Sequence, residues 1–178
     1  FDADAHLLAA AAARGLDADV PCCPGWSVAD LVDHISRVYA SRTDIVEQGL
    51  VDEWPPRRPR PEGAHPLGWF RNEAASLTAA LAGADPAAPA ITFSHEQTVG
   101  FWIRRMAHET LVHRIDAEQA HGYESQVDHE LATDGVAELL EVFVTRFPDW
   151  GEFVPGDDVV RVSTAGSDWT LRLGRFVG

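Results

Sequence analysis

Residues 108–114, HETLVHR, place two histidines and a glutamate close together within one predicted helix. At ~100° per residue, Glu109 and His113 share a face with Trp102 and Met106. A carboxylate beside an imidazole is costly to bury among apolar side chains unless the two are paired or bind a cation. This spacing therefore indicates either a metal site or a local Glu–His pair on one helix.

His108 is expected to play a different part from His113. The two histidines are five residues apart, so their directions diverge by ~140°. The zinc-protease pattern HExxH needs histidines four apart, and the segment does not match it. We expect His108 to face another helix or solvent and not to bind a metal.

A third metal ligand would have to come from another helix, and His34 is the best candidate. It lies beside Leu31 and Ile35 on the side of its predicted helix that should face the core. Together with Glu109 and His113 it would form a site of two histidines and one carboxylate. Zinc accepts these ligands and leaves a fourth position for water or a thiol, and nickel, iron, manganese or cobalt would also tolerate them. The alternative for His34 is a core histidine that only hydrogen bonds.

Four helices are predicted to position these residues. Ser27 and Asp30 have the spacing of a capping box before the second helix, and Ser94 and Gln97 have it before the fourth. A proline-rich loop, residues 52–67, separates the second helix from the third, and its arginines are expected to be solvated. The predicted helices cover residues 4–14, 28–47, 68–83 and 95–121.

The character of the sequence changes near residue 129. DGVAELLEVFVTRF, residues 134–147, predicts a further helix, and residues 159–163 and 168–173 alternate like two strands around the turn TAGS. The predicted fold is mainly α, with a four-helix domain over residues 1–128 and a small α+β segment over 129–178. Whether this short segment is a complete domain is left open.

Composition excludes several classes of partner. The chain has 178 residues, 14 basic and 28 acidic, and a net charge of −14. This charge argues against binding to nucleic acid or to anionic membranes. No apolar run reaches the ~20 residues that span a bilayer. The two cysteines, Cys22 and Cys23, are adjacent and offer no disulfide framework, which favours a reducing, cytoplasmic location.

Two stretches of the sequence resemble the mycothiol-dependent maleylpyruvate isomerase family, within the wider DinB-like metal-binding proteins. They are VPCCPGWSVADLVDHI, with a histidine deep in the helix after its turn, and FWIRRMAHETLVHRIDAE. A weaker similarity covers DGVAELLEVF and SDWTLRL, which look like the start of that family's C-terminal domain.

The resemblance implies a fold, a site and an activity. The fold would be an up-down four-helix bundle, and the family's metal triad corresponds to His34, Glu109 and His113. The metal, most simply zinc, would bind mycothiol as a cosubstrate and favour its thiolate. In the isomerase this thiolate adds to a cis double bond, and rotation and elimination give the trans isomer. A small-molecule thiol and a small-molecule substrate are thus the expected partners of a monomer or homodimer.

Several roles and activities stay open at this point. Asp116 could orient His113 or form a surface ion pair with Arg114. Cys23 is expected to pack as a small apolar residue and Trp26 to pack at the helix entrance. The family's functional C-terminal arginine does not map uniquely onto Arg161, Arg172 or Arg175.

The same metal scaffold could serve other chemistry, because a fold does not fix a function. The first reading is a mycothiol-dependent isomerase or S-transferase. The alternatives are a metal-dependent hydrolase, in which the metal activates water, and a non-catalytic metal-binding or stress protein.

Overall fold

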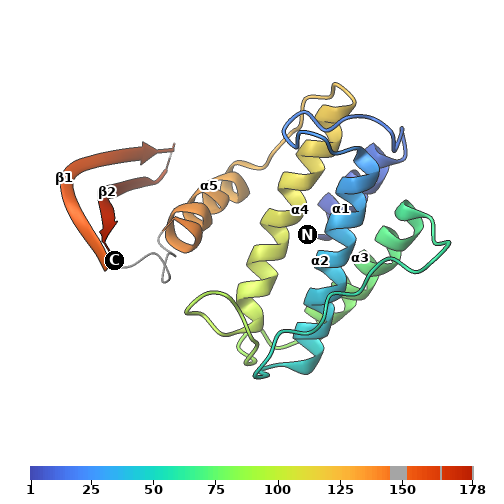
Figure 1. The fold of residues 1–178 in the computed structure, drawn as a ribbon, viewed down its shortest axis with the longest axis horizontal. Helices are drawn as coiled ribbons and strands as arrows, with labels where there is room; N and C mark the ends of the chain where they lie inside the picture. Colours follow the sequence, from blue (N-terminus) through green and yellow to red (C-terminus); the bar gives the residue numbers. More distant parts are fainter. Residues whose placement is uncertain (145–151, 165, 178) are drawn as a thin grey trace. The chain divides into compact units, whose positions relative to one another are not determined.

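The computed structural model describes residues 1–144, 152–164 and 166–177. The chain divides into two compact units, Phe1–Gln126 and Val127–Gly178. The first is a four-helix bundle and the second contains a helical segment and a two-stranded antiparallel sheet, so the predicted mainly α fold with a small α+β segment is confirmed. The helices of the bundle are α1 (Asp2–Ala12), α2 (Val28–Gln48), α3 (Pro66–Gly83) and α4 (Val99–Ala120) (Figure 1).

The core of the bundle is built from one face of each helix. Helix α2 packs against α3 and α4, and α1 packs against α3 and α4. Burial of each large apolar side chain contributes about 1.5–3 kcal/mol relative to its exposed state. Among the described residues, no helix has both the length and the apolarity that crossing a membrane requires. The largest fully buried apolar side chains include Leu8, Leu31, Ile35, Tyr39, Ile45, Phe70, Leu77, Trp102 and Met106.

Helix α2 begins where its capping box predicts. The Ser27 hydroxyl accepts a hydrogen bond from the Asp30 backbone N–H at 3.3 Å, and the Asp30 carboxylate accepts one from the Ser27 N–H at 2.9 Å. These hydrogen bonds to Ser27 hold the pKa of Asp30 below its ordinary value. Gly25 has a φ of +82° in the preceding turn, a backbone conformation that glycine adopts without strain. The capping box therefore fixes the point at which the chain enters α2.

Helix α4 begins later than the sequence predicts, and the capping box expected at Ser94 and Gln97 is wrong. The Gln97 side chain instead forms two hydrogen bonds with the Thr92 backbone. Its Oε1 accepts from the Thr92 N–H at 3.2 Å, and its Nε2 donates to the Thr92 carbonyl at 3.1 Å. These bonds stabilise a loop in which residues 95–98 are not helical. Thr98 is the N-cap, and its hydroxyl accepts from the Phe101 N–H.

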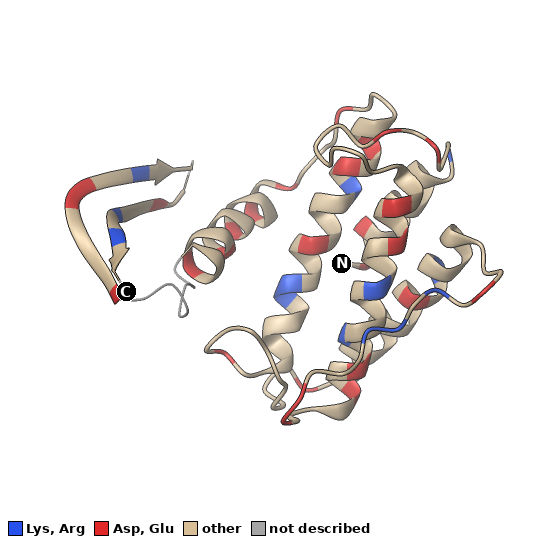
Figure 2. Cartoon of the chain, viewed as in Figure 1, with Lys and Arg blue, Asp and Glu red and all other residues tan. Residues whose placement is uncertain are grey.

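The proline-rich loop is held to the bundle by its arginines. Arg58 forms ion pairs with Asp44 of α2 at 3.1 Å and with Glu73 of α3 at 3.8 Å. Arg60 pairs with Asp33 of α2 at 3.0 Å. Arg58 is exposed, as expected for a solvated loop, and Arg60 is half-buried, but both also pair with carboxylates of the bundle. Figure 2 shows the basic stretch in the loop that connects α2 and α3.

The second unit begins with α5 (His129–Glu138), followed by one π-helical turn, η1 (Leu139–Phe143). Asp128 caps α5 by accepting from the Leu131 N–H, so this helix starts five residues before the predicted 134. Residues 145–147 of the predicted helix lie outside the described residues.

Strands β1 (Glu152–Ser163) and β2 (Asp168–Val177) form an antiparallel hairpin with an irregularity between Pro155 and Val159. Both predicted strands lie within them. Each is longer than predicted, because the pairing continues past the irregularity from Pro155 opposite Gly174 to Glu152 opposite Val177. Arg161, Arg172 and Arg175 are all exposed on this hairpin.

A buried hydrogen bond connects α2 to α4 within the core. The hydroxyls of Tyr39 and Thr110 are 2.6 Å apart, and both residues are completely buried. Burial raises the pKa of Tyr39, although the hydrogen bond to Thr110 acts in the opposite direction. The Tyr39 ring also packs edge-on against Phe1 and at a tilt against Phe70. This residue thus joins the polar and apolar parts of the core.

We expect Ser27→Ala to lower the free energy of unfolding by about 1 kcal/mol, because it removes the N-cap acceptor. Urea denaturation followed by circular dichroism measures the change. Ser94→Ala is the matched control, because Ser94 caps no helix, and its effect should stay within about 0.5 kcal/mol. Equal losses in the two variants would contradict the assigned start of α2.

We expect Tyr39→Phe to lower the free energy of unfolding by about 1–3 kcal/mol, because the buried Thr110 hydroxyl loses this partner. Thr110→Val should have a loss of similar size. The variant with both changes should lose less unfolding free energy than the sum of the two single losses, because neither hydroxyl is then left without its partner. Strictly additive losses in urea denaturation would show that the two hydroxyls do not interact.

Candidate metal centre

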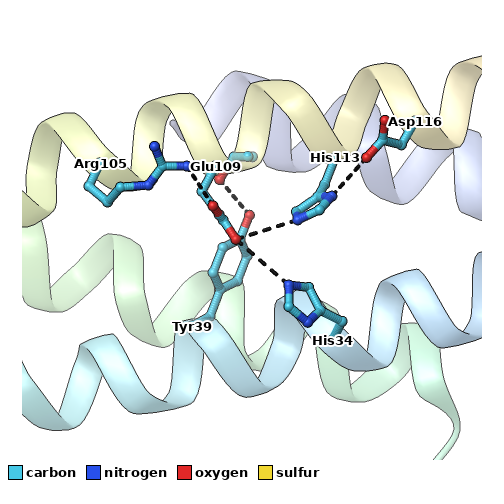
Figure 3. Close-up of polar contacts among 7 residues, drawn as sticks. His34, Tyr39, Arg105, Glu109, His113 and Asp116 are labelled. Atoms are coloured by element: carbon cyan, nitrogen blue, oxygen red, sulfur yellow. Dashed lines mark hydrogen bonds and ion pairs between the residues drawn. The ribbon is translucent and has the colours of Figure 1, made fainter. Parts of the chain in front are cut away.

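The structure brings His34, Glu109 and His113 together from two helices. His34 lies in the second turn of α2, and Glu109 and His113 lie one turn apart on α4. Their side chains converge on one point (Figure 3). One carboxylate oxygen, Oε1 of Glu109, is 3.7 Å from Nε2 of His34 and 3.4 Å from Nε2 of His113. The three residues named from their spacing are therefore neighbours in the fold.

These distances fit a shared cation better than a pair of hydrogen bonds. Hydrogen bonds between nitrogen and oxygen are usually about 2.7–3.2 Å long, and both contacts exceed that range. Donor atoms bound tetrahedrally at about 2.0–2.1 Å from one zinc ion lie about 3.3 Å from one another. One ligand atom from each residue lies within 4.8 Å of the others. Two imidazoles and one carboxylate are also the donor set that zinc, nickel and iron accept.

The site is closed on the α4 side and open at His34. The side chains of Glu109 and His113 are 21% and 14% exposed, whereas that of His34 is 39% exposed. The Trp26 ring lies 5.2 Å from the His34 ring, centroid to centroid, and is tilted against it. Trp26 thus covers one side of His34 at the entrance of α2, where it was expected to pack. A small molecule can approach the site from the half-exposed edge of His34.

Positive charge surrounds the Glu109 carboxylate. Burial by itself would raise the pKa of Glu109, but its contacts with His113 and His34 and the charge of Arg105 hold this pKa well below its ordinary range. Arg105 donates to Oε2 of Glu109 at 2.5 Å, which leaves Oε1 directed at the histidines (Figure 3). Sequence reasoning missed Arg105. The signal was its spacing, because it lies four residues before Glu109 on the same helix.

A second arginine, Arg42 of α2, adds to this positive region. Its guanidinium lies over the Trp102 ring at 4.3 Å and over the Trp54 ring at 5.3 Å. Burial is the main cause that lowers the pKa of Arg42 to about 10; Glu109 opposes this shift, and the charges of Arg57 and Arg105 add to it. Arg42 remains cationic at neutral pH, so the side of the site next to Glu109 favours anions.

Asp116 holds His113 in place. Its Oδ2 atom lies 2.9 Å from Nδ1 of His113, so Nε2 of the ring is directed toward Glu109. Burial lowers the pKa of His113, but its hydrogen bond with Asp116 and its contact with the Glu109 carboxylate outweigh burial and raise this pKa to about 9. Of the two readings of Asp116, the structure supports the contact with His113. A carboxylate on the outer nitrogen of a histidine is the usual arrangement behind a metal ligand.

Arg114 and His108 are buried within the bundle and are not among the three converging residues. Arg114 forms an ion pair with Asp4 of α1 at 3.0 Å and donates to the Gln126 carbonyl at 2.6 Å. The alternative of a surface ion pair between Arg114 and Asp116 is therefore wrong. His108 is 4% exposed, which agrees with a direction toward another helix and not toward solvent.

Cys22 is a further neighbour that sequence reasoning missed. Its thiol donates to Oδ1 of Asp116 at 2.8 Å. This hydrogen bond is the main cause that raises the pKa of Cys22 to about 12, with burial and the Asp116 charge adding to it. Cys23 is half-buried in the same turn. The adjacency of the two cysteines was visible in the sequence, but the hydrogen bond of Cys22 to a residue 94 positions later was not.

Comparison with known proteins agrees with this geometry. The family model described as the mycothiol maleylpyruvate isomerase N-terminal domain matches residues 2–118. That span includes His34, Glu109 and His113 and nearly all of the four-helix bundle. Neither the curated proteins nor the solved structures yielded a match. Through its bundle the chain belongs to the mycothiol maleylpyruvate isomerase N-terminal domain family, within the DinB-like superfamily.

Proposed function

We propose that the bundle binds one divalent metal ion, zinc in the first instance, through His34, Glu109 and His113. We further propose that it serves a mycothiol-dependent isomerase or S-transferase. The observation that carries the metal is the position of Glu109 Oε1, which lies 3.7 and 3.4 Å from two imidazole nitrogens. These separations are too long for good hydrogen bonds and suit ligands around one ion.

Each residue around the site has a defined part in holding the ion. Glu109 supplies the anionic ligand, and Arg105 on its other oxygen fixes the orientation of the carboxylate. Asp116 occupies Nδ1 of His113 and so leaves Nε2 to the metal. The half-exposed His34 leaves room for one more ligand from solution. A divalent ion with such an open position favours the thiolate form of a thiol that reaches it.

A small-molecule thiol is a better nucleophile for this site than a protein cysteine. The Cys22 thiol donates a hydrogen bond to Asp116, and this bond is the main cause that raises the pKa of Cys22 well above its ordinary value, so little of its thiolate forms near neutral pH. Cys23 is half-buried. The family description names mycothiol, which would supply the missing thiol. The chain's own part is then to hold the metal and to orient the incoming thiol and substrate.

The charge of the site supports an anionic substrate. Arg42 and Arg105 both act electrostatically on the region around Glu109. A substrate with a carboxylate would be attracted to this side of the site. The two alternatives are a metal-dependent hydrolase, which would need no thiol, and a metal-binding protein without turnover. Thiol binding and turnover distinguish them from the isomerase or transferase.

Metal content tests the proposed triad directly. Elemental mass spectrometry of the purified chain should find about one divalent metal per chain. His34→Ala, Glu109→Ala and His113→Ala should each lose it, because two remaining ligands hold zinc poorly. His108→Ala is the matched control from the same helix and should keep the metal, with folding checked by circular dichroism. A His34→Ala protein with full metal content would disprove the triad.

Thiol binding tests the proposed mycothiol dependence. Calorimetric titration of the zinc-loaded chain with mycothiol should show binding that disappears in the metal-free chain and in Glu109→Ala. S-methyl mycothiol is the matched ligand, because it keeps the sugar and cysteine parts but cannot form a thiolate. Its binding should be at least about tenfold weaker, since the metal prefers the thiolate. Equal binding of the two ligands would favour one of the alternatives that use no thiol.

A further inference from the structure

Asp116, the partner of His113, belongs to a second cluster of side chains that could hold a metal. Cys22, Cys23 and Asp116 each offer one ligand atom, and these atoms lie within 4.8 Å of one another. Cys22 is exposed, Cys23 is half-buried and Asp116 is buried. The cluster therefore joins an accessible turn to a carboxylate inside the bundle.

The turn that carries the two cysteines is held by its own backbone. The Cys23 N–H donates to the Val20 carbonyl at 3.0 Å, and the Cys23 carbonyl accepts from the Trp26 N–H at 2.9 Å. The Val20 N–H donates in turn to the Trp26 carbonyl at 2.9 Å. These three bonds close the loop from residue 20 to residue 26 and keep both thiols near Asp116. The donor atoms are thus brought together before any ion arrives.

From these contacts we propose that Cys22, Cys23 and Asp116 form a second site, for a thiophilic divalent cation such as Zn²⁺ or Cd²⁺. Two sulfurs select soft or borderline ions, and one carboxylate oxygen completes a three-ligand set that such ions accept. None of the three residues belongs to the first triad. The proposal therefore does not depend on metal binding by His34, Glu109 and His113.

A cation suits this cluster better than thiol oxidation does. The thiol of Cys22 donates a hydrogen bond to Oδ1 of Asp116. Oxidation and disulfide exchange need the thiolate, so both are slow at such a thiol. A divalent ion reverses the effect of Asp116, because the carboxylate that retains the proton also attracts the ion that replaces it. Binding would release the thiol protons to solvent and form two metal–sulfur bonds.

Asp116 would connect the two sites, as a ligand of the second and as the partner of His113, a ligand of the first. Oδ1 of Asp116 contacts Cys22, and Oδ2 contacts His113 at 2.9 Å. An ion on the cysteines would withdraw negative charge from His113, and two cations so close together repel each other. The second ion should therefore bind at least about tenfold more weakly when the first site is filled.

The test is a titration of the full metal-free chain with cadmium chloride, followed by ultraviolet absorption. The chain has only two cysteines, so any sulfur-to-cadmium charge-transfer band reports on this cluster alone. The wild type should bind two cadmium ions and develop the band. His34→Ala should bind one ion and keep the full band. The variant with both Cys22→Ser and Cys23→Ser should bind one ion without it.

Asp116→Asn tests the third ligand. It should weaken the cadmium affinity measured by the band at least about tenfold, since outer-shell changes alone typically cost 10–100-fold. Asp17→Asn, in an exposed residue of the same charge, is the matched control and should leave the affinity unchanged.

Three results would overturn the proposal. The first is a wild-type titration without the band. The second is a band that Asp116→Asn leaves equally strong at every cadmium concentration. The third is a band that grows only as the chain dimerises in analytical ultracentrifugation, because the ion would then bridge two chains. A wild-type chain that binds no ion at His34, Glu109 and His113 but still shows the band would contradict the proposed function and support this second site.

Discussion

The negative charge of Glu109 inside the bundle is the constraint on which the site depends. A buried carboxylate is costly unless opposite charges and hydrogen-bond donors surround it. Arg105 meets one of its oxygens, and His34 and His113 face the other. Because His34 comes from α2 and the others from α4, this charge requires the two helices to keep a fixed spacing and rotation. The hydrogen bond between Tyr39 and Thr110 joins the same two helices within the core.

Charges alternate along one side of α4. Arg105, Glu109, His113 and Asp116 follow one another at spacings of four, four and three residues, and each contacts the next. Such spacings place successive side chains on neighbouring positions of a helix. The row continues off the helix to the Cys22 thiol, which donates to Asp116. A change at the exposed end of this row thus acts on the outer nitrogen of a proposed metal ligand.

The arrangement of the bundle would suit the proposed thiol chemistry. The helices hold the ligands of the first proposed site. The turn before α2 places Trp26 against His34, and the proline-rich loop places Trp54 against Trp102 of α4. The loop is in turn held by the ion pairs of Arg58 and Arg60. A scaffold of this kind fixes the position of a metal while leaving its outer side to exchangeable ligands. Substrate choice would then rest on the flanking segments and on the charge of Arg42 and Arg105.

The sequence by itself determined the helices, the start of α2 and the relation between Glu109 and His113. All of these follow from local spacing and local hydrogen bonds, which the chain carries wherever it packs. The same local rules misplaced the start of α4, because the Gln97 side chain bonds to Thr92 and not to the expected cap. They also placed the start of α5 five residues too late, although Asp128 has the residue type of an N-cap.

Only the tertiary structure decided which distant residues meet. Sequence spacing suggested His34 as a partner of Glu109, but only the packing of α2 against α4 sets their separation. The contacts of Cys22 with Asp116, and of Arg114 with Asp4, join residues far apart in the chain and follow no local period. Such pairs depend on how the helices rotate and approach one another as the core packs. Hydrophobic burial sets that approach, and it is a property of the whole bundle rather than of any one segment.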